Sequence, residues 1–489
     1  MGDLERRLYD LSQSDMYPFH MPGHKRAMAD RFAPEDGGSL YSYDITEIDG
    51  FDNLHHPEGL LLELQERAAA LWRTRRSFLL VNGSTCGLLA AIGAVLPRGG
   101  HLLMARNCHK AAYHGAYLGN LRITYLYPAA TGCGIQGSIT PRQVEEALER
   151  EPDIGAVLVT SPTYDGVVSD IAEIAGAAHK RGIPLIVDEA HGAHLGFHGA
   201  FPETAVRCGA DVVVQSLHKT LPALTQSAIL HLCSDRVDED RLAWLLTVYQ
   251  TSSPSYVLLV GMERCLDILE AGGEELFDRY ACRLKTFYER ADRLQRLRVW
   301  SRRELSKEEA FGLDPSKILI SAQPIGLTGH DLYERFRKSY RLQPEMCQGG
   351  YVLMMTGMMD TDEGMERLWQ ALLEMDEQWA SQQAVSVQYA DQQAAEKGCP
   401  ADYVSLVYGS RSQQMSLTEG LEAPREEVPL EQAKGRVSGT FVTLYPPGIP
   451  LVAPGEVISE EVLEAVSLCR KLQGSVHGIC HGQIKVVIS

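Results

Sequence analysis

The stretches PLIVDEAHG, residues 184–192, and ADVVVQSLHKTL, residues 210–221, each pass from an apolar run to a charged side chain. In the first stretch Asp188 directly follows the apolar run, and in the second Lys219 comes a few residues after it. Short apolar runs bounded by turn residues are typical of buried strands. The interval between the two residues leaves room for one helix and one strand, so we expect Asp188 and Lys219 to lie at the ends of neighbouring strands.

The same alternation of strand and helix extends in both directions from these stretches. Further buried parallel strands are predicted for HLLMA, RITYLY, GAVLVT and SAILHL. Helical stretches lie between several of them: STCGLLAAIGAVL, TPRQVEEALER and IAEIAGAAHKRG. Thr140 followed by Pro141 is a helix N-cap with proline at the first helical position. This pattern predicts an α/β fold with a mostly parallel central sheet covered by helices on both faces.

The rest of the chain is expected to flank this sheet. Residues 1–60 are rich in turn formers and are interpreted as an N-terminal arm, and a helix is predicted over residues 60–72. Residues 61–310 form the predicted large domain, with long helices after residue 255. Residues 311–489 form one or more smaller C-terminal α+β domains, in which the prolines of YPPGIPLVAPGE impose a loop or turn.

Two further polar motifs follow predicted strands. In NGSTCGLLAAI, Ser84 and Thr85 open a helix, and the free N–H groups of a helix N-terminus favour an anion. A plain helix cap is the alternative for this motif. His109 follows the HLLMA strand, where an imidazole can lie flat on an aromatic ring or remain on a surface loop. All these residues would converge at the carboxyl edge of one sheet, where such folds bind ligands.

Together, the motifs indicate one particular cofactor. A buried Asp188 needs a cationic partner, and a protonated pyridine nitrogen would be one; the alternative is an aspartate that caps the next helix. Ala190 is small enough for a flat ring to lie close, and His191 and His194 are candidates for the same pocket. A partly desolvated Lys219 would be a nucleophilic amine, whereas a lone lysine after a strand is usually a solvated loop residue. The order of an anion-binding turn, a stacking imidazole, a carboxylate and a lysine therefore predicts pyridoxal 5'-phosphate (PLP), held as a Schiff base on Lys219.

The composition limits the other possibilities. Hydrophobic residues make up 45% of the 489 residues and charged residues 22%, which is ordinary for a globular protein. A formal net charge of −18 argues against nucleic-acid binding and mildly favours cationic small molecules. No apolar run is long enough to cross a bilayer, and the charged start MGDLERRLYD is no secretory signal. With 11 scattered cysteines and no CxxC pair, we expect a cytoplasmic protein with reduced thiols and no bound metal.

The sequence resembles the Orn/Lys/Arg decarboxylase family of PLP fold type I, the aspartate-aminotransferase-like fold. The matching motifs span most of the chain: FHMPGHK (19–25), GST (83–85), CHK (108–110), SPTYDGVVSDI (161–171), VDEAHG (187–192), SLHKTL (216–221) and YPPGIPLVAPGE (445–456). The resemblance implies a short form without the N-terminal regulatory domain of the long inducible members. It also implies decarboxylation of lysine, arginine or ornithine to the corresponding polyamine-type amine and CO2.

The resemblance further implies roles for matching residues. Lys219 would form the Schiff base, Asp188 would pair with the pyridine nitrogen, and His109 would stack on the ring. The phosphate would be held by four residues of the same chain: Ser84, Thr85, Ser216 and His218. Thr251 and Ser252 would reach the phosphate of a neighbouring subunit, which implies a homodimer or a larger homo-oligomer. His218 and Lys219 are both candidates for returning a proton to the substrate.

The residues that contact substrate are less directly indicated. A cationic side chain needs a carboxylate partner once water is excluded, and Glu456, Asp44 and Glu47 are the candidates, although acidic loop residues are mostly solvated. One departure from the family concerns the same region, because GRVSGTFV (435–442) has Thr440 where a glutamate is common. The ring-holding residues also serve other reactions, so an aminotransferase, a lyase or a PLP-binding homologue without catalysis remains an alternative.

Overall fold

The computed structural model describes residues 15, 17–19, 52–321, 323–383, 403–446 and 448–488. Most of the expected N-terminal arm, with Asp44, Glu47 and nearly all of FHMPGHK, lies outside the described residues, as does most of the Gln/Ala-rich stretch before residue 403. The domain boundaries expected at residues 60 and 310 stay predictions.

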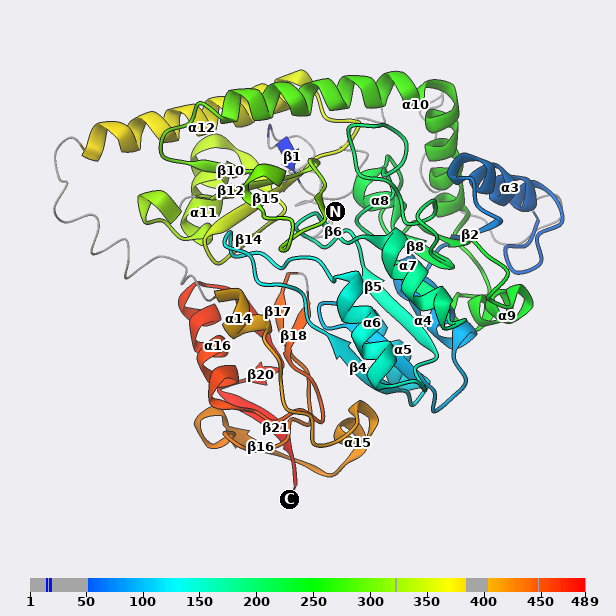
Figure 1. Cartoon of the computed structure of the whole chain (residues 1–489). Helices are drawn as coiled ribbons and strands as arrows, with labels where there is room; N and C mark the ends of the chain where they lie inside the picture. The colour runs from blue at the N-terminus through cyan, green and yellow to red at the C-terminus, as the bar shows by residue number, and fades with distance from the viewer. Residues whose placement is uncertain are drawn as a thin grey trace, which may run out of the picture.

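A seven-stranded sheet forms the centre of the molecule (Figure 1). In spatial order its strands are β2 (Arg76–Leu80), β9 (Ala228–Leu232), β8 (Val212–Gln215), β7 (Leu185–Asp188), β5 (Ala156–Thr160), β3 (His101–Ala105) and β4 (Arg122–Leu126). The pairs β8–β7, β7–β5, β5–β3 and β3–β4 are parallel. The mostly parallel sheet expected from the sequence is confirmed, and Asp188 is the last residue of β7.

One strand departs from the expected direction. The SAILHL run forms β9, which is antiparallel to both of its neighbours, β8 and β2. Between β8 and β9 the chain forms only a four-residue helix, α8 (Leu217–Thr220), and a short loop. A parallel connection needs a crossover of a dozen or more residues, usually with a full helix, whereas antiparallel neighbours can be joined by a short turn. The expectation of a parallel strand here was therefore wrong.

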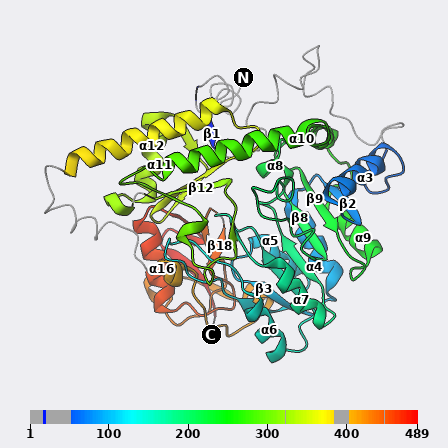
Figure 2. The same cartoon turned by 45° about the horizontal axis from the view of Figure 1, so that its top comes forward.

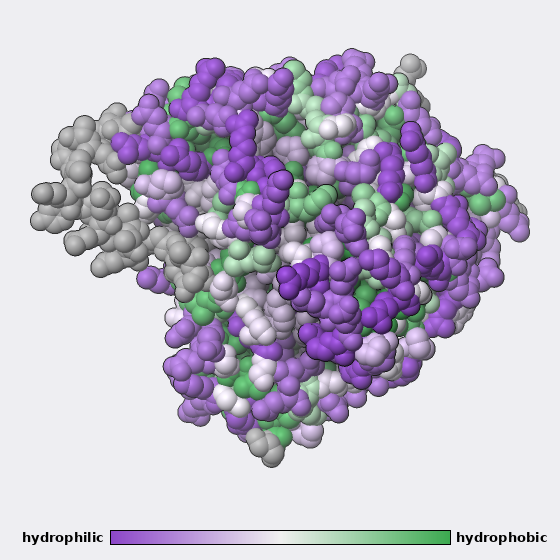
Figure 3. Space-filling model, in the orientation of Figure 1, coloured by the Kyte–Doolittle hydropathy of each residue, from purple (hydrophilic) through white to green (hydrophobic). Residues whose placement is uncertain are grey.

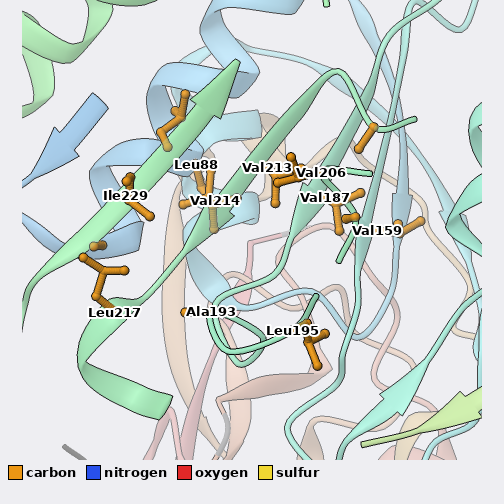
Figure 4. Close-up of a cluster of buried hydrophobic side chains, with 14 of the residues drawn as sticks. Leu88, Val159, Val187, Ala193, Leu195, Val206, Val213, Val214, Leu217 and Ile229 are labelled. Atoms are coloured by element: carbon orange, nitrogen blue, oxygen red, sulfur yellow. The ribbon is translucent and has the colours of Figure 1, made fainter. Parts of the chain in front are cut away.

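Helices cover the sheet and bury its residues. They are α3 (Leu60–Trp72), α4 (Gly83–Val95), α5 (Lys110–Leu118), α6 (Pro141–Arg150), α7 (Ile171–Lys180) and α9 (Glu239–Tyr249). The predicted bounds of α3 are confirmed, and Thr140 caps α6 in a reciprocal capping box with Gln143. Figure 4 shows Val187, Val214 and Ile229 of adjacent strands gathered near Leu88 of α4. Strands buried on both faces explain the continuous apolar runs in the sequence.

A second unit follows the long helix α10 (Tyr256–Ala291), which runs beside α12 (Asp362–Gln383) across the molecule (Figures 1 and 2). Its four-stranded sheet has the order β10 (Arg298–Trp300), β12 (Lys317–Ser321), β15 (Tyr351–Met355) and β14 (Met346–Gln348). Helix α11 (Gly329–Tyr340) packs on this sheet, and β13 (Leu342–Pro344) pairs with β1 (Tyr17–Phe19). The short pair β6 (Val167–Val168) and β11 (Gly312–Leu313) joins this unit to the loop that follows β5.

The C-terminal unit has a hydrophobic core of its own. Its strands are β16 (Arg425–Pro429), β17 (Val442–Tyr445), β18 (Ile449–Val452), β19 (Ser475–His477), β20 (Ile479–Cys480) and β21 (Gln483–Val487). Its helices are α14 (Tyr403–Tyr408), α15 (Leu417–Glu422) and α16 (Glu460–Lys471). The YPPGIP motif, expected to be a loop or turn, is the tip of the antiparallel hairpin β17–β18. This tip reaches the carboxyl edge of the central sheet, because Tyr445 and Pro446 line a cavity there.

The face of the molecule in Figure 3 is predominantly polar. Hydrophilic residues cover most of the face shown in Figure 3, with apolar residues in small separate areas. Within the described ranges, no helix is long and apolar enough to cross a membrane.

Candidate active site

A cavity of about 170 Å³ opens at the carboxyl edge of the central sheet, between the sheet and the β17–β18 hairpin. Six residues that the sequence singled out line it: Ser84, His109, Asp188, Ala190, His191 and Lys219. Asp188, Ala190 and His191 come from the end of β7, whereas Ser84, His109 and Lys219 follow β2, β3 and β8, far away in the sequence. The expected convergence at this edge is therefore seen in the structure, as the parallel strand order requires.

Lys219 lies on α8 directly beyond β8, and its side chain enters the cavity. Its Nζ atom is 2.8 Å from Nε2 of His191. Burial lowers the pKa of the Lys219 amine to about 8, although the charge of Asp188 acts in the opposite direction. A large share of this amine is therefore neutral near pH 8, which makes it a nucleophile.

Asp188 lies on the floor of the cavity and is only 3% exposed. Its Oδ1 accepts a hydrogen bond of 3.1 Å from the backbone N–H of Ala190. Burial raises the pKa of the Asp188 carboxyl, and the positive charge of Lys219 lowers it. A buried carboxylate with only one hydrogen bond is costly, so the site favours a cation beside Asp188.

His109 is the N-cap of α5, and its Nδ1 accepts a hydrogen bond of 3.2 Å from the N–H of Ala111. Burial, together with the nearby charge of Lys219, lowers the pKa of His109 to about 4. The imidazole is therefore neutral at physiological pH, and the hydrogen bond places its proton on Nε2. A neutral ring at this position can lie against a flat ligand without repelling a cation.

The N-terminus of α4 forms the polar end of the site. Asn82 is the N-cap, but its side chain makes no capping hydrogen bond, and Gly83 takes a left-handed φ of 74°. The hydroxyl of Ser216, from the end of β8, donates to Ser84 Oγ at 3.0 Å. Two hydroxyls and uncapped backbone N–H groups thus meet at one helix terminus, which suits an anion.

Other expected phosphate residues are placed around this end but do not line the cavity. Thr85 is exposed, and Nδ1 of His218 contacts the carbonyl of Ser227 at 2.9 Å. Thr251 and Ser252 are also exposed, and the backbone N–H of Thr251 donates to Asn82 Oδ1 at 3.3 Å. Thr251 therefore lies beside the anion-binding turn of its own chain.

The sequence analysis missed several residues of the cavity wall. They are Asn107, Gln136, Thr160, Thr163, Tyr164, Asp165, Gln348 and Tyr445. Asn107 Oδ1, Gln136 Oε1 and His191 Nδ1 are buried without a hydrogen-bond partner in the part of the chain that the structure describes. Buried polar atoms of this kind are normally satisfied, so the cavity is built for a polar ligand. Asp165 follows a predicted strand, as Asp188 does, and that signal could have identified it.

Glu456, the first choice for contacting a substrate cation, has a different partner. It is 1% exposed and does not line the cavity, and its Oε2 is 2.9 Å from Nη2 of Arg106. Oε2 also accepts from the backbone N–H of Ala453 at 2.7 Å. Arg106 directly follows β3, so this buried ion pair joins the C-terminal unit to the central sheet. The carboxylate of Glu456 is thus already neutralised by a cation of the protein itself.

A second buried ion pair supports the loop after β7. Lys317 on β12 is fully buried, with Nζ 2.9 Å from Asp314 Oδ2 and 3.1 Å from the carbonyl of His191. His194, also a candidate for the cavity, instead contacts Asp314 at 3.2 Å. This network fixes the backbone of His191, whose ring contacts Tyr164 with centroids 4.5 Å apart. The second unit therefore holds the wall of the cavity that faces Lys219.

Comparison with known proteins identifies relatives over nearly the whole chain. The profile "Orn/Lys/Arg decarboxylase, major domain" matches residues 3–346, and the profile "Orn/Lys/Arg decarboxylase, C-terminal domain" matches residues 409–478. The arginine decarboxylase of Bacillus subtilis (strain 168) is 31% identical over 446 residues, which cover 91% of this chain and 88% of that protein.

Solved structures show the same fold. The structure of the E. coli constitutive lysine decarboxylase covers 100% of this chain and 82% of its own, with a TM-score of 0.76 and 20% identity. A structure described as SPT with PLP internal aldimine covers 74% of this chain and 83% of its own, with a TM-score of 0.51 and 14% identity. The fold is therefore that of PLP fold-type I enzymes, as the sequence analysis predicted.

The ion pair between Arg106 and Glu456 leads to a prediction about stability. Replacing Glu456 with Gln should lower the free energy of unfolding by about 3–5 kcal/mol, because the charge of Arg106 would stay buried without a counter-charge. Chemical denaturation measures this change. Glu460→Gln is the matched control, because Glu460 pairs with Lys434 at the surface and its loss should matter far less. Equal free energies of unfolding for the two variants would show that the buried ion pair does not stabilise the protein.

Proposed function

The chain belongs to the Orn/Lys/Arg decarboxylase family, and from that premise we propose that it decarboxylates a basic amino acid with PLP as its cofactor. The observation that carries the proposal is the convergence of Lys219, Asp188 and His109 on one cavity. The family alone does not select the reaction, since a fold hosts many chemistries and function lies in the site. The acidic chain and its polar cavity are consistent with a cationic substrate.

The residues of the cavity fit PLP in three respects. Ser84, Ser216 and the uncapped start of α4 suit a phosphate. The buried carboxylate of Asp188 suits a protonated ring nitrogen, and the small Ala190 leaves room beside it. The depressed pKa of Lys219 suits a lysine that forms a covalent bond with the aldehyde of the cofactor. Thr85 and His218 are proposed as further phosphate contacts.

In the proposed reaction the protein orients the groups and controls the protons. PLP, when bound, withdraws the electrons left at Cα when the carboxylate departs as CO2. Asp188 would hold the ring nitrogen of PLP in its protonated form, and the neutral imidazole of His109 would pack against the ring. Nζ of Lys219 and Nε2 of His191, 2.8 Å apart, can share one proton, so this pair is placed to return it to the substrate. The hairpin tip with Tyr445 and Pro446 covers the cavity and limits the access of water.

Within the basic amino acids, we propose arginine as the substrate to test first. The B. subtilis relative named arginine decarboxylase is 31% identical to this chain, whereas the E. coli constitutive lysine decarboxylase is 23% identical in the same kind of sequence comparison. The product would then be the corresponding amine, of the polyamine type.

We also propose that a second copy of the chain completes the site. Thr251 and Ser252 are exposed beside the phosphate-binding turn, and Thr251 is tied to Asn82. The family resemblance supports the proposal that these exposed hydroxyl groups contact the phosphate of a neighbouring molecule in a homodimer.

The proposed reaction has a direct assay. The purified protein with PLP should release CO2 and the matching amine from arginine, lysine or ornithine. Neutral and acidic amino acids should react far more slowly, because they lack the cation that the cavity would recognise. Release of a keto acid and no CO2 would instead indicate an aminotransferase, and inertness toward every amino acid would indicate a binding protein.

Lys219 should be the site of covalent attachment. In the wild type, borohydride should fix PLP on the peptide that contains Lys219, and Lys219→Ala should abolish this fixation. The rate at which apoprotein binds PLP covalently should rise as pH increases through about 8, where the Lys219 amine becomes neutral. An ordinary lysine would show this rise near pH 10.4. Fixation on a different peptide, or the same peptide modified in the variant, would remove Lys219 from this role.

Asp188 should affect turnover more than cofactor binding. Asp188→Asn should keep the PLP absorbance but reduce kcat by roughly 10²–10³-fold, because an amide cannot hold the ring nitrogen protonated. Asp170→Asn, at the N-cap of α7 and outside the cavity, is the matched control. Steady-state kinetics at saturating PLP give the comparison, and a near-normal kcat for Asp188→Asn would contradict the role.

A further inference from the structure

Most buried carboxylates of the described residues face a cation or accept several hydrogen bonds. Asp314 faces Lys317, and Glu456 faces Arg106. Asp376 accepts three backbone N–H groups instead. Such pairing is expected because an unpaired buried charge is expensive.

Asp165 is an exception that lies in the wall of the active-site cavity. It is 7% exposed, and its Oδ1 accepts a hydrogen bond of 2.6 Å from the hydroxyl of Tyr351. Within the described ranges, its Oδ2 has no hydrogen-bond partner. This oxygen is also not completely buried. Burial raises the pKa of Asp165 to about 6, and no positively charged side chain contributes to that shift. Among the described residues, the carboxylate therefore lacks the cation that a buried charge needs.

The position of Asp165 is rigid. It lies between β5 and β6, and the β6–β11 pair secures this loop to the second unit. Tyr351 is itself buried in a hydrophobic cluster, with its ring 5.5 Å from that of Trp300. The β6–β11 pair positions the backbone of Asp165, and Tyr351 orients its carboxylate. A carboxylate positioned in this way can select a ligand by where the ligand carries its positive charge.

We propose that Asp165 binds the distal cation of the substrate and thereby selects basic amino acids. Gln136 supplies a second acceptor, because its Oε1 is buried in the same cavity wall without a partner. One carboxylate and one amide oxygen match the several N–H donors of a guanidinium or an ammonium group. The inference deepens the proposed decarboxylase function and rests on it.

Two other carboxylates fit this role less well. Asp188 is proposed to hold the ring nitrogen of PLP, so its loss would affect every substrate alike. Glu345 lines an adjoining groove and already accepts a hydrogen bond from the hydroxyl of Tyr164. Asp165 is thus the cavity carboxylate that is available to a substrate.

The test uses the holoenzyme with matched cationic and neutral substrates. Asp165→Asn should reduce kcat/KM for arginine and lysine by about 100-fold or more, mainly through KM, because one partner of a desolvated charge pair is removed. Citrulline and norleucine lack the distal charge and should react slowly. Their kcat/KM should change by less than about 3-fold in Asp165→Asn. The product amines agmatine and cadaverine should inhibit the wild type competitively. They should inhibit Asp165→Asn much more weakly, because they carry the same distal cation. Asp170→Asn is the control for an aspartate outside the cavity.

Several outcomes overturn the assignment. An unchanged KM for cationic substrates in Asp165→Asn would show that Asp165 does not bind their distal charge. An equal loss of kcat/KM on the neutral substrates would show the same. If Asp165→Asn fails to fold, Tyr351→Phe removes only the hydroxyl that orients the carboxylate and should raise KM selectively for arginine and lysine. A rise in KM that is equal for cationic and neutral substrates in Tyr351→Phe would contradict the proposal. If the wild type decarboxylates no cationic amino acid, the proposed function itself fails, which is a distinct result.

Discussion

The burial of a carboxylate and an amine near each other at one sheet edge is the constraint on which the site of this protein depends. Asp188 and Lys219 lie at the ends of β7 and β8, which are neighbouring parallel strands. Each group is destabilised by burial and stabilised by the opposite charge of the other. Burial is the larger effect for both groups, so the pKa of Asp188 is raised and the pKa of Lys219 is lowered. Both shifts favour the neutral form of the group. A site in this condition suits a ligand with a ring nitrogen that can carry a proton beside Asp188 and a carbonyl that the neutral amine of Lys219 can attack.

Two further buried ion pairs place the rest of the molecule around this centre. Arg106–Glu456 ties the C-terminal unit to the end of β3, one residue before Asn107 of the cavity wall. Lys317–Asp314 ties the second unit to the loop after β7 through the carbonyl of His191. Both pairs are costly to desolvate and costly to break. They favour one arrangement of three units, and the cavity exists only in that arrangement because all three contribute to its wall.

The sequence analysis succeeded where the signal was local. Continuous apolar runs predicted the strands, and the polar residues that follow them predicted Ser84, His109, Asp188 and Lys219 as neighbours at one edge. The direction of β9 was predicted wrongly, because an apolar run does not show whether the chain crosses over or turns back. Asp165 was overlooked although it also follows a strand, since nothing in its immediate sequence shows that its carboxylate lacks a cation. Asp44 and Glu47 lie outside the described residues.

The sequence by itself determined the α/β fold, the order of the motifs and the residues that suit PLP. These features depend on hydrophobic periodicity and on short segments whose geometry is set by the chain nearby. Only the tertiary structure decided which acidic residue faces the cavity. Glu456 pairs with an arginine 350 residues away in the sequence, whereas Asp165 is brought beside a tyrosine and, in the part of the chain that the structure describes, beside no cation. The free energy of a buried charge depends on every group packed around it, and those groups come from segments that meet only in the folded protein.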